Sequence, residues 1–468
     1  MTADDILLRP AHEIAAAVNG GRISARAITE AALDRVVAAD PRLGAFTDAT
    51  PARALAEAAA VDASVAAGVV LPLAGVPYAV KNLFDIAGIT TRAGSLINRD
   101  NPPAAADATL VRRMGEAGAV LLGGLNMGEY AYDFTGENLH DGASLNPHDP
   151  GHMSGGSSGG SGTAVASGMV AASLGSDTNG SIRVPSSFCG LFGLKPTFGR
   201  LSRTGTYPFC ASLDHLGPFA RSVADLALML DVLQGDDPAD PAQVRCPPVA
   251  AMAELNKGVD GLRIAVAGGY FRDPQWSEAN AAVDTVAAAL GVTEEVMVPE
   301  AARARAAAYV ITTAESATLH LPRLKSRAGD FDPEVRDRLI SGAMVPAPWV
   351  IQAQRFRSWF REAMRGVFAR VDVILAPATP FPAPKSGTKT VVIGGVTLPM
   401  RPNIGIFTQP ISFIGLPVVA VPVWRTGASL PIGVQVIAPA WREDLALRVA
   451  RHLEASGVVS APVAPLPA

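Results

Sequence analysis

Residues 153–168 have the sequence MSGGSSGGSGTAVASG, and the interpretation of the whole chain depends on them. Their glycine and serine content alone is typical of a flexible linker. Ordered patterns lie on both sides, however: the helical DATLVRRMGEAGA and the strand-like AVLLGGL before the stretch, and AVASGMVAASLG running out of it. A tether between ordered elements would have no purpose, so we expect a loop that brings backbone close to a reacting group.

The rest of the chain alternates between helical and strand patterns. Residues 221–235, RSVADLALMLDVLQG, form an amphipathic helical pattern. Four later runs are strand-like: LRIAVAG, VDVILAP, LPVVAVPVW and PIGVQVIAP. This alternation predicts an α/β fold with a mixed central sheet covered by helices on both faces. No internal repeat or deep break is visible, so we expect a single α/β/α domain over residues 1–468.

Composition narrows the class of protein. With 49% hydrophobic and 18% charged residues, the 468-residue chain can bury a large core. The net charge is −4 and the basic residues are dispersed, which argues against nucleic-acid binding. Residues 63–80 are uncharged, but their two prolines and two glycines would break a membrane-spanning helix. Three scattered cysteines and an acidic N-terminus without a signal pattern predict a reduced, cytoplasmic setting and no membrane.

Nucleophile and base candidates come from serine and lysine. Residues 155–159 match G-x-S-x-G around Ser157, but we can pair no histidine convincingly with that serine. Lys81 is one of only six lysines and ends the apolar run AGVPYAVK, where desolvation would favour a neutral amine that acts as a base. The ordinary alternative is a strand-end lysine with its ammonium group in water. A second match, S-x-x-K at Ser386 and Lys389, lies in a proline-rich loop and is treated as coincidence.

A second serine-rich stretch supplies another hydroxyl. SLGSDTNGSIRVPSSFCG begins at Ser173, and its DTNG turn leads directly to Ser181. The backbone N–H groups of Thr178, Asn179 and Gly180 could converge with that of Ser181 on one oxygen and stabilise an oxyanion. An ordinary Asx-type turn with Ser181 as a helix cap remains the alternative.

Three long motifs, in the correct order, closely resemble the amidase signature family: GVPYAVKNLFDIAG, GGSSGGS and GSDTNGSIRVPSSFCGLFGLKPTFGRLS. The resemblance implies a Ser–Ser–Lys triad that cleaves amide C–N bonds. Ser181 falls on the acylated nucleophile, Ser157 on a bridging serine that follows a cis peptide bond, and Lys81 on the base. The family's usual turn is D-x-G-G-S. Here Asn179 replaces the first glycine, tolerates a positive φ and brings its side chain within reach of the pocket.

The choice of substrate depends on two further positions. Within the family, the chain is most like carboxybiuret hydrolases and the A subunit of glutaminyl-tRNA amidotransferases. In the amidotransferase an arginine binds the glutamine carboxylate and an aspartate binds its ammonium group. The resemblance places Arg357 on that arginine, although a structural salt bridge is an equal alternative, and Gly405 on the aspartate. A carboxylated ureido compound, which carries no amine, therefore fits better than glutamine, with release of ammonia.

Two other functions stay open: a broad amidase acting on simple or aryl amides, and a glutamine-dependent subunit whose main role is assembly. The resemblance implies a small accessory subunit, and we expect a homodimer or a hetero-oligomer. No cofactor or metal is predicted, because the seven histidines show no ligand spacing. Three of them, His140, His148 and His152, are close enough in sequence to the serine-rich loop to line a pocket.

Overall fold

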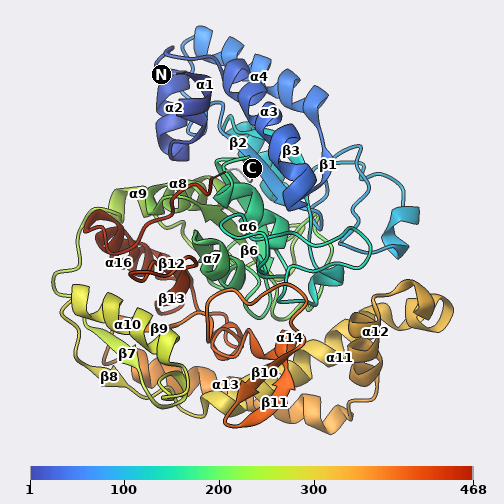
Figure 1. Ribbon diagram of the computed structural model, residues 1–468, viewed down its shortest axis with the longest axis vertical. Helices are drawn as coiled ribbons and strands as arrows, with labels where there is room; N and C mark the ends of the chain where they lie inside the picture. The colour runs from blue at the N-terminus through green and yellow to red at the C-terminus, as the bar shows by residue number, and fades with distance from the viewer. Residues whose placement is uncertain (1, 466–468) are drawn as a thin grey trace.

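A mixed β-sheet runs through the computed structural model, which describes residues 2–465 (Figure 1). Within these residues the sheet has 11 strands in the order β1-β3-β2-β4-β6-β5-β12-β13-β9-β7-β8. β2 pairs in parallel with β3 and β4, whereas β4, β6, β5, β12, β13 and β9 pair antiparallel in succession. The bounds are β1 Phe46–Ala49, β2 Pro77–Lys81, β3 Val120–Leu125, β4 Ala172–Asp177, β5 Phe192–Lys195, β6 His215–Ala220, β7 Ile264–Ala267, β8 Glu295–Val296, β9 Val373–Pro377, β12 Val418–Val423 and β13 Ile432–Ile437.

The central strands form where the sequence has uninterrupted apolar runs. All six residues of β12, VVAVPV, and all six of β13, IGVQVI, are buried. A strand buried on both faces needs apolar side chains at every position, so continuous runs replace the alternating pattern of a half-exposed strand. The mixed sheet predicted from the sequence is confirmed.

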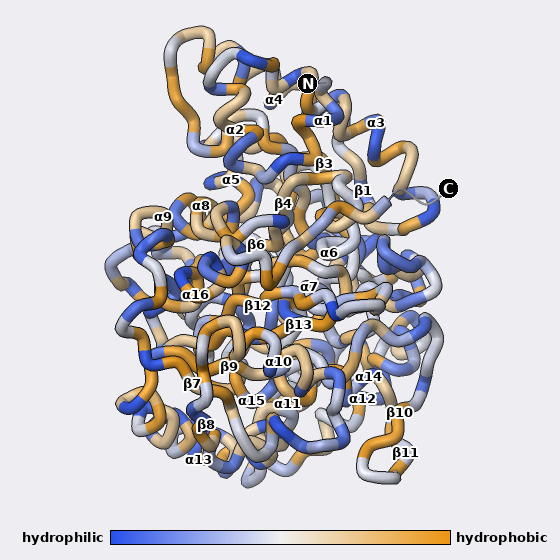
Figure 2. Tube along the Cα trace, turned by 60° about the vertical axis from the view of Figure 1, so that its left-hand side comes forward, coloured by the Kyte–Doolittle hydropathy of each residue, from blue (hydrophilic) through white to orange (hydrophobic). Residues whose placement is uncertain are grey.

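Helices cover both faces of the sheet, as predicted. On one face α6 packs against β4, α7 against β12 and β13, and α10 against β9 and β13. On the other face α8 packs against β5 and β6, and α16 against β12. Figure 2 shows these two groups on opposite sides of the strands. The bounds are α5 Thr109–Glu116, α6 Gly159–Ala166, α7 Arg183–Cys189, α8 Val223–Leu233, α9 Ala251–Glu254, α10 Ser277–Ala289 and α16 Glu443–Ala455.

Two further helical groups lie at opposite ends of the molecule (Figure 1). The N-terminal group is α1 Ala3–Leu7, α2 Ala11–Asn19, α3 Ala25–Leu43 and α4 Pro51–Ala66. The other consists of α11 Ala301–Arg327, α12 Pro333–Ala343 and α13 Ala347–Phe368, with α11 packed against α12, α13 and α15 Gln409–Ser412. A hairpin, β10 Thr390–Ile393 and β11 Val396–Pro399, leads into α14 Met400–Asn403. No helix among residues 2–465 is long and apolar enough to cross a membrane.

Candidate active site

The glycine- and serine-rich stretch is an ordered loop that leads into α6. The peptide bond between Gly156 and Ser157 is cis, as the family resemblance implies. The N–H of Gly156 donates to the carbonyl of Phe134 at 2.9 Å, and a Cβ atom on Gly156 would overlap the carboxylate of Asp133. Glycine is therefore required because a neighbouring loop approaches the backbone closely, and the stretch is not a tether.

Lys81, the last residue of β2, ends among three serine hydroxyls. Its Nζ atom lies 2.7 Å from the Oγ of Ser157, 3.0 Å from that of Ser158 and 2.9 Å from that of Ser176. Lys81, Ser157 and Ser158 are fully buried. The sequence predicted the pair of Lys81 and Ser157, but not the two other serines. Ser158 could have been suspected from its place beside Ser157, whereas Ser176 reaches Lys81 only because β2 and β4 are neighbours.

The hydrogen bonds around Lys81 suit a neutral amine. The hydroxyl of Ser158 donates to the carbonyl of Ser176 at 3.2 Å, so it accepts a hydrogen bond from Lys81. Burial lowers the pKa of Lys81 to about 7, although the carboxylates of Asp214 and Asp177 act in the opposite direction. A neutral amine has two N–H groups for Ser158 and Ser176, and its lone pair is then free to take the proton of Ser157.

Ser181 lies in the wall of a small cavity and is 3% exposed. Thr178 and Asn179 line the same cavity, as the sequence predicted for this turn. The other lining residues come from the 131–134 loop, from the loop between β5 and β6, from α11 and α12, and from the chain around α14 and α15. They are Ala131, Tyr132, Asp133, Phe134, Phe209, Tyr309, Thr312, Arg338, Pro402 and Gln409.

The turn before Ser181 leaves its backbone donors free. Among residues 2–465, no hydrogen-bond acceptor is found for the N–H groups of Asn179, Gly180 and Ser181. Gly180 has φ +143°, and a Cβ atom on it would overlap the side chain of Thr408. Thr408 also donates to the carbonyl of Asn179 at 2.6 Å, which fixes the turn. Donors held in this way can stabilise a negative charge without reorganising.

Asn179 differs from the expectation in one respect. Its backbone does not adopt a positive φ, because the unusual conformation falls on Gly180 instead. Its side chain does reach the cavity, where Nδ2 donates to the hydroxyl of Thr312 on α11 at 3.0 Å. The Oδ1 atom of Asn179 is buried and has no partner within the described residues.

Gly405, the position of the amidotransferase aspartate, lies against Phe134. A Cβ atom on Gly405 would overlap the ring of Phe134, so Phe134 fills the space that a side chain at residue 405 would need.

Behind the turn, a buried ion pair fixes the strand end. The guanidinium of Arg183 contacts both carboxylate oxygens of Asp177 at 2.9 Å, and both side chains are fully buried. Burial raises the pKa of Asp177, but the charge and hydrogen bonds of Arg183 outweigh this effect and hold the pKa well below its usual value. Asp177 therefore stays ionised next to the residues that carry the candidate oxyanion donors.

The structure does not bring Arg357 to Ser181. Arg357 is buried on the apolar side of α13, as its spacing predicted, but it lines a different cavity. Its Nε and Nη2 atoms donate to the carbonyls of Phe413 and Ser212 at 2.6 and 2.8 Å. The helical periodicity identified the buried side of α13 but could not tell which cavity that side meets.

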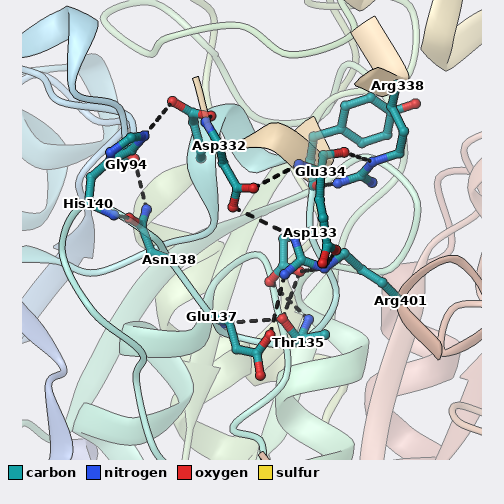
Figure 3. Close-up of polar contacts among 12 residues, drawn as sticks. Gly94, Asp133, Thr135, Glu137, Asn138, His140, Asp332, Glu334, Arg338 and Arg401 are labelled. Carbon is teal, nitrogen blue, oxygen red and sulfur yellow. Dashed lines mark hydrogen bonds and ion pairs between the residues drawn. The ribbon is translucent and has the colours of Figure 1, made fainter. Parts of the chain in front are cut away.

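The arginine that lines the Ser181 cavity is Arg338, on α12. Figure 3 shows its side chain near Glu334. Arg338 donates to the carbonyls of Glu334 and Tyr132 and lies over the ring of Tyr132 at 4.0 Å. Within the described residues it forms no ion pair with a carboxylate. The sequence analysis missed it, although Arg338 follows the buried Val335 by three residues and therefore lies near the buried side of its helix.

A group of acidic residues around Arg401 holds α12 against the loop that precedes the serine-rich stretch (Figure 3). Arg401 lies 3.0 Å from Glu334 on α12, and 3.3 Å from both Asp133 and Glu137. Arg401 thus connects the element that carries Arg338 to the loop that contacts Gly156.

The three histidines near the serine-rich loop do not line the Ser181 cavity. His140 contacts Glu129 at 3.1 Å, and His148 contacts the carbonyl of Cys189 at 3.1 Å. His152 lies against Asp149. Each imidazole is held by a local partner, so none is a candidate base for this site.

Comparison with known proteins agrees with this geometry. A family model described as Amidase matches residues 27–447, and the chain belongs to the amidase signature family. It is a hydrolase that acts on amide C–N bonds.

Among individual relatives, the chain is 54% identical to AtzE of Pseudomonas sp. (strain ADP), which is a subunit of 1-carboxybiuret hydrolase, over 95% of this chain and 98% of that protein. It is 37% identical to the A subunit of glutamyl-tRNA(Gln) amidotransferase from Koribacter versatilis, over 94% and 96% of the two chains. A solved structure of a vestigial protein complex, connected with an s-triazine catabolic enzyme, matches with a TM-score of 0.95 and 53% identity, over 97% of this chain and all of that one.

Proposed function

We propose that the chain hydrolyses a carboxylated ureido compound such as carboxybiuret and releases ammonia through an acyl-enzyme on Ser181. The observation that carries the reaction is the buried contact of 2.7 Å between the Nζ atom of Lys81 and the Oγ atom of Ser157. The substrate class is supported by the identity of 54% with a carboxybiuret hydrolase subunit.

The reaction begins with proton transfer from Ser181 through Ser157 to the neutral amine of Lys81. The Oγ of Ser181 attacks the amide carbonyl, and the oxyanion is stabilised by the N–H groups of Thr178, Asn179 and Gly180 together with that of Ser181. The relay then reverses: the proton passes back to the amide nitrogen, the C–N bond breaks, and ammonia leaves. Water attacks the resulting carbamate ester with the same relay as base, which releases the carbamic acid and restores the hydroxyl of Ser181.

We assign recognition of the substrate's carboxylate to Arg338 instead of Arg357. Arg338 lines the same cavity as Ser181 and has no carboxylate partner of its own within the described residues, whereas Arg357 donates to two carbonyls beside another cavity. A guanidinium binds a carboxylate in a planar, two-pronged contact, which would orient a small substrate. Phe134 closes the position where an ammonium-binding acid would be needed for glutamine.

Ammonia release from the purified chain tests this proposal. Carboxybiuret, biuret, glutamine and a simple aliphatic amide are compared in parallel, and we expect release from carboxybiuret above the others. Ser181→Ala should abolish it. Arg338→Gln should raise KM for carboxybiuret by about 10-fold to 100-fold, because a charge-assisted hydrogen bond contributes about 1.5–3 kcal/mol.

Arg336→Gln, on the same helix but away from the cavity, is the matched control and should leave KM unchanged. Arg357→Gln should also leave it unchanged. Equal turnover of the aliphatic amide, unaffected by Arg338→Gln, would instead identify a broad amidase. Preferential turnover of glutamine would favour the amidotransferase type.

We also propose that residues 1–468 form one domain that works in the cytoplasm as a homodimer or with a small accessory subunit. The continuous sheet supports a single domain, and the three free cysteines support a reducing, cytoplasmic setting. The vestigial complex reported for a similar structure supports assembly with another subunit. Light scattering of the chain alone should give a mass above that of one chain. A monomer that gains activity with an added small subunit would favour the hetero-oligomer.

A further inference from the structure

A second cavity of about 530 Å³ lies beside α13 and shares no lining residue with the Ser181 cavity. It is lined by α13 with the adjoining Ala369 and by four segments that are far apart in sequence, at residues 197–198, 244, 414–416 and 439–441. Its volume is that of a site for a small organic molecule. The amide hydrolysis proposed above makes no use of it.

Three arginines line this cavity, and no aspartate or glutamate does. Arg357 is 9% exposed and Arg361 lies one helical turn further along α13. Burial, together with the nearby charge of Arg361, lowers the pKa of Arg357. In the part of the chain that the structure describes, neither arginine forms an ion pair, whereas Arg365 contacts Glu362 at 2.8 Å.

Arg357 also has one nitrogen, Nη1, that is available to donate a hydrogen bond to a ligand. Its Nε and Nη2 atoms donate to backbone carbonyls, but its Nη1 atom has no acceptor within the described residues. The neighbouring guanidinium groups of Arg357 and Arg361 repel one another, and the nearby charge of Glu315 offsets this repulsion only in part, because the pKa of Arg357 is still lowered. An anion in the cavity would relieve both effects.

The remaining wall is largely apolar. Its large side chains are Phe198, Met364, Phe368, Ile414, Leu416 and Trp441. Trp441 has φ +70°, a conformation that residues other than glycine adopt uncommonly. A ligand that matches this wall must combine one negative charge with an apolar, preferably aromatic, body.

We propose that this cavity binds a small aromatic or aliphatic monocarboxylate, with its carboxylate against Arg357 and Arg361 and its apolar body against the wall. Such a ligand would meet both features of the site: a charge-assisted contact in a half-buried position and the removal of an apolar surface from water. This assignment does not depend on the proposed reaction, and either can fail alone.

Isothermal titration of the full chain with 2-naphthoate tests the assignment, with the neutral 2-acetylnaphthalene as the matched ligand. We expect 2-naphthoate to bind more tightly than the neutral compound. Arg361→Gln should weaken its binding about fivefold, because an exposed ion pair contributes up to about 1 kcal/mol. The charge reversal Arg361→Glu should weaken it further. Arg355→Gln, on the same helix but outside the cavity, should have no effect.

Arg338→Gln distinguishes binding of 2-naphthoate in the cavity beside α13 from binding in the Ser181 cavity. If the ligand binds beside α13, this variant should leave the affinity for 2-naphthoate unchanged. The assignment is overturned by equal affinity for the two ligands or by equal affinity of the wild type and Arg361→Glu. Loss of binding in Arg338→Gln would likewise overturn it, since the ligand would then occupy the Ser181 cavity. Absence of any heat up to millimolar ligand at two well-separated temperatures would mean that the cavity is not a binding site, because burial of an apolar ligand changes the heat capacity.

Discussion

Lys81 keeps its amine away from water and in contact with three hydroxyls. At the residue scale the proposed chemistry depends on this environment, because only the neutral amine can accept a proton. With a pKa of about 7, Lys81 is mostly protonated below that pH and mostly neutral above it. Burial therefore gives Lys81 a pKa at which it can act as the general base, the role that a histidine has in other serine hydrolases.

The pH dependence of activity follows directly. We predict that kcat/KM for the amide substrate rises with pH through a midpoint near 7 and then reaches a plateau. Lys81→Met should lower kcat by about 10²-fold to 10⁴-fold, the usual range for loss of a general base. Rates measured from pH 5.5 to 9 check both points, with circular dichroism as a control for folding. A flat profile between pH 6 and 8 would contradict the assignment of Lys81 as the base.

Sequence patterns predicted these residues unevenly. Lys81, Ser157 and the turn before Ser181 were identified because long local motifs contain them. Arg357 was predicted to bind the substrate but lines a different cavity from Ser181, and Arg338 was missed. Both lie on helices whose packing is determined by residues far away in the chain. A periodic pattern shows which side of a helix is buried but does not show what that side meets.

At the scale of elements, the loop before α6 is confined by its neighbour. Asp133 occupies the space beside Gly156, so this loop cannot carry a side chain there without moving. We predict that Gly156→Ala destabilises the fold by about 1–3 kcal/mol through overpacking, and lowers activity more than this loss of stability alone would.

Gly115→Ala is the matched control for Gly156→Ala. Gly115 lies on α5, and nothing lies within 4 Å of a Cβ atom built there. This substitution should stabilise the fold by about 0.5–1 kcal/mol, because alanine is the better helix former. Urea denaturation measures both variants. If Gly156→Ala were as stable and active as the wild type, the close approach of Asp133 to Gly156 would not be required for stability or activity.

The strands themselves were predictable, but their order was not. Apolar runs such as LPVVAVPVW and PIGVQVIAP indicated β12 and β13. The neighbours in the sheet, however, come from distant parts of the chain: β12 lies between β5 and β13, and β2 between β3 and β4. Strand order depends on how connections cross the sheet, which local periodicity does not encode.

On the scale of the whole molecule, Arg183 joins parts of the chain that the sequence keeps far apart. Besides its ion pair with Asp177 on β4, it donates to the side chain of Gln435 on β13 at 2.6 Å and to the carbonyl of Thr408 at 3.0 Å. Arg183 thereby links β4 to β13 and to the segment that contains Thr408, next to the candidate oxyanion donors.

Removing Arg183 should leave Asp177 as an unpaired charge in the core. We predict that Arg183→Met destabilises the molecule by about 3–5 kcal/mol, as measured by chemical denaturation. Arg26→Gln, which breaks an exposed ion pair with Glu30, should leave the transition almost unchanged. A loss below about 1 kcal/mol for Arg183→Met would show that Asp177 is stabilised by other groups.

The identity of the nucleophile is the central claim, and covalent labelling tests it most directly. A fluorophosphonate reacts with an activated serine by forming a P–O bond while fluoride leaves. Peptide mass mapping should find the label on Ser181, with labelling absent in Ser181→Ala and much slower in Lys81→Met. A label on Ser157, or one that persists in Ser181→Ala, would contradict the account.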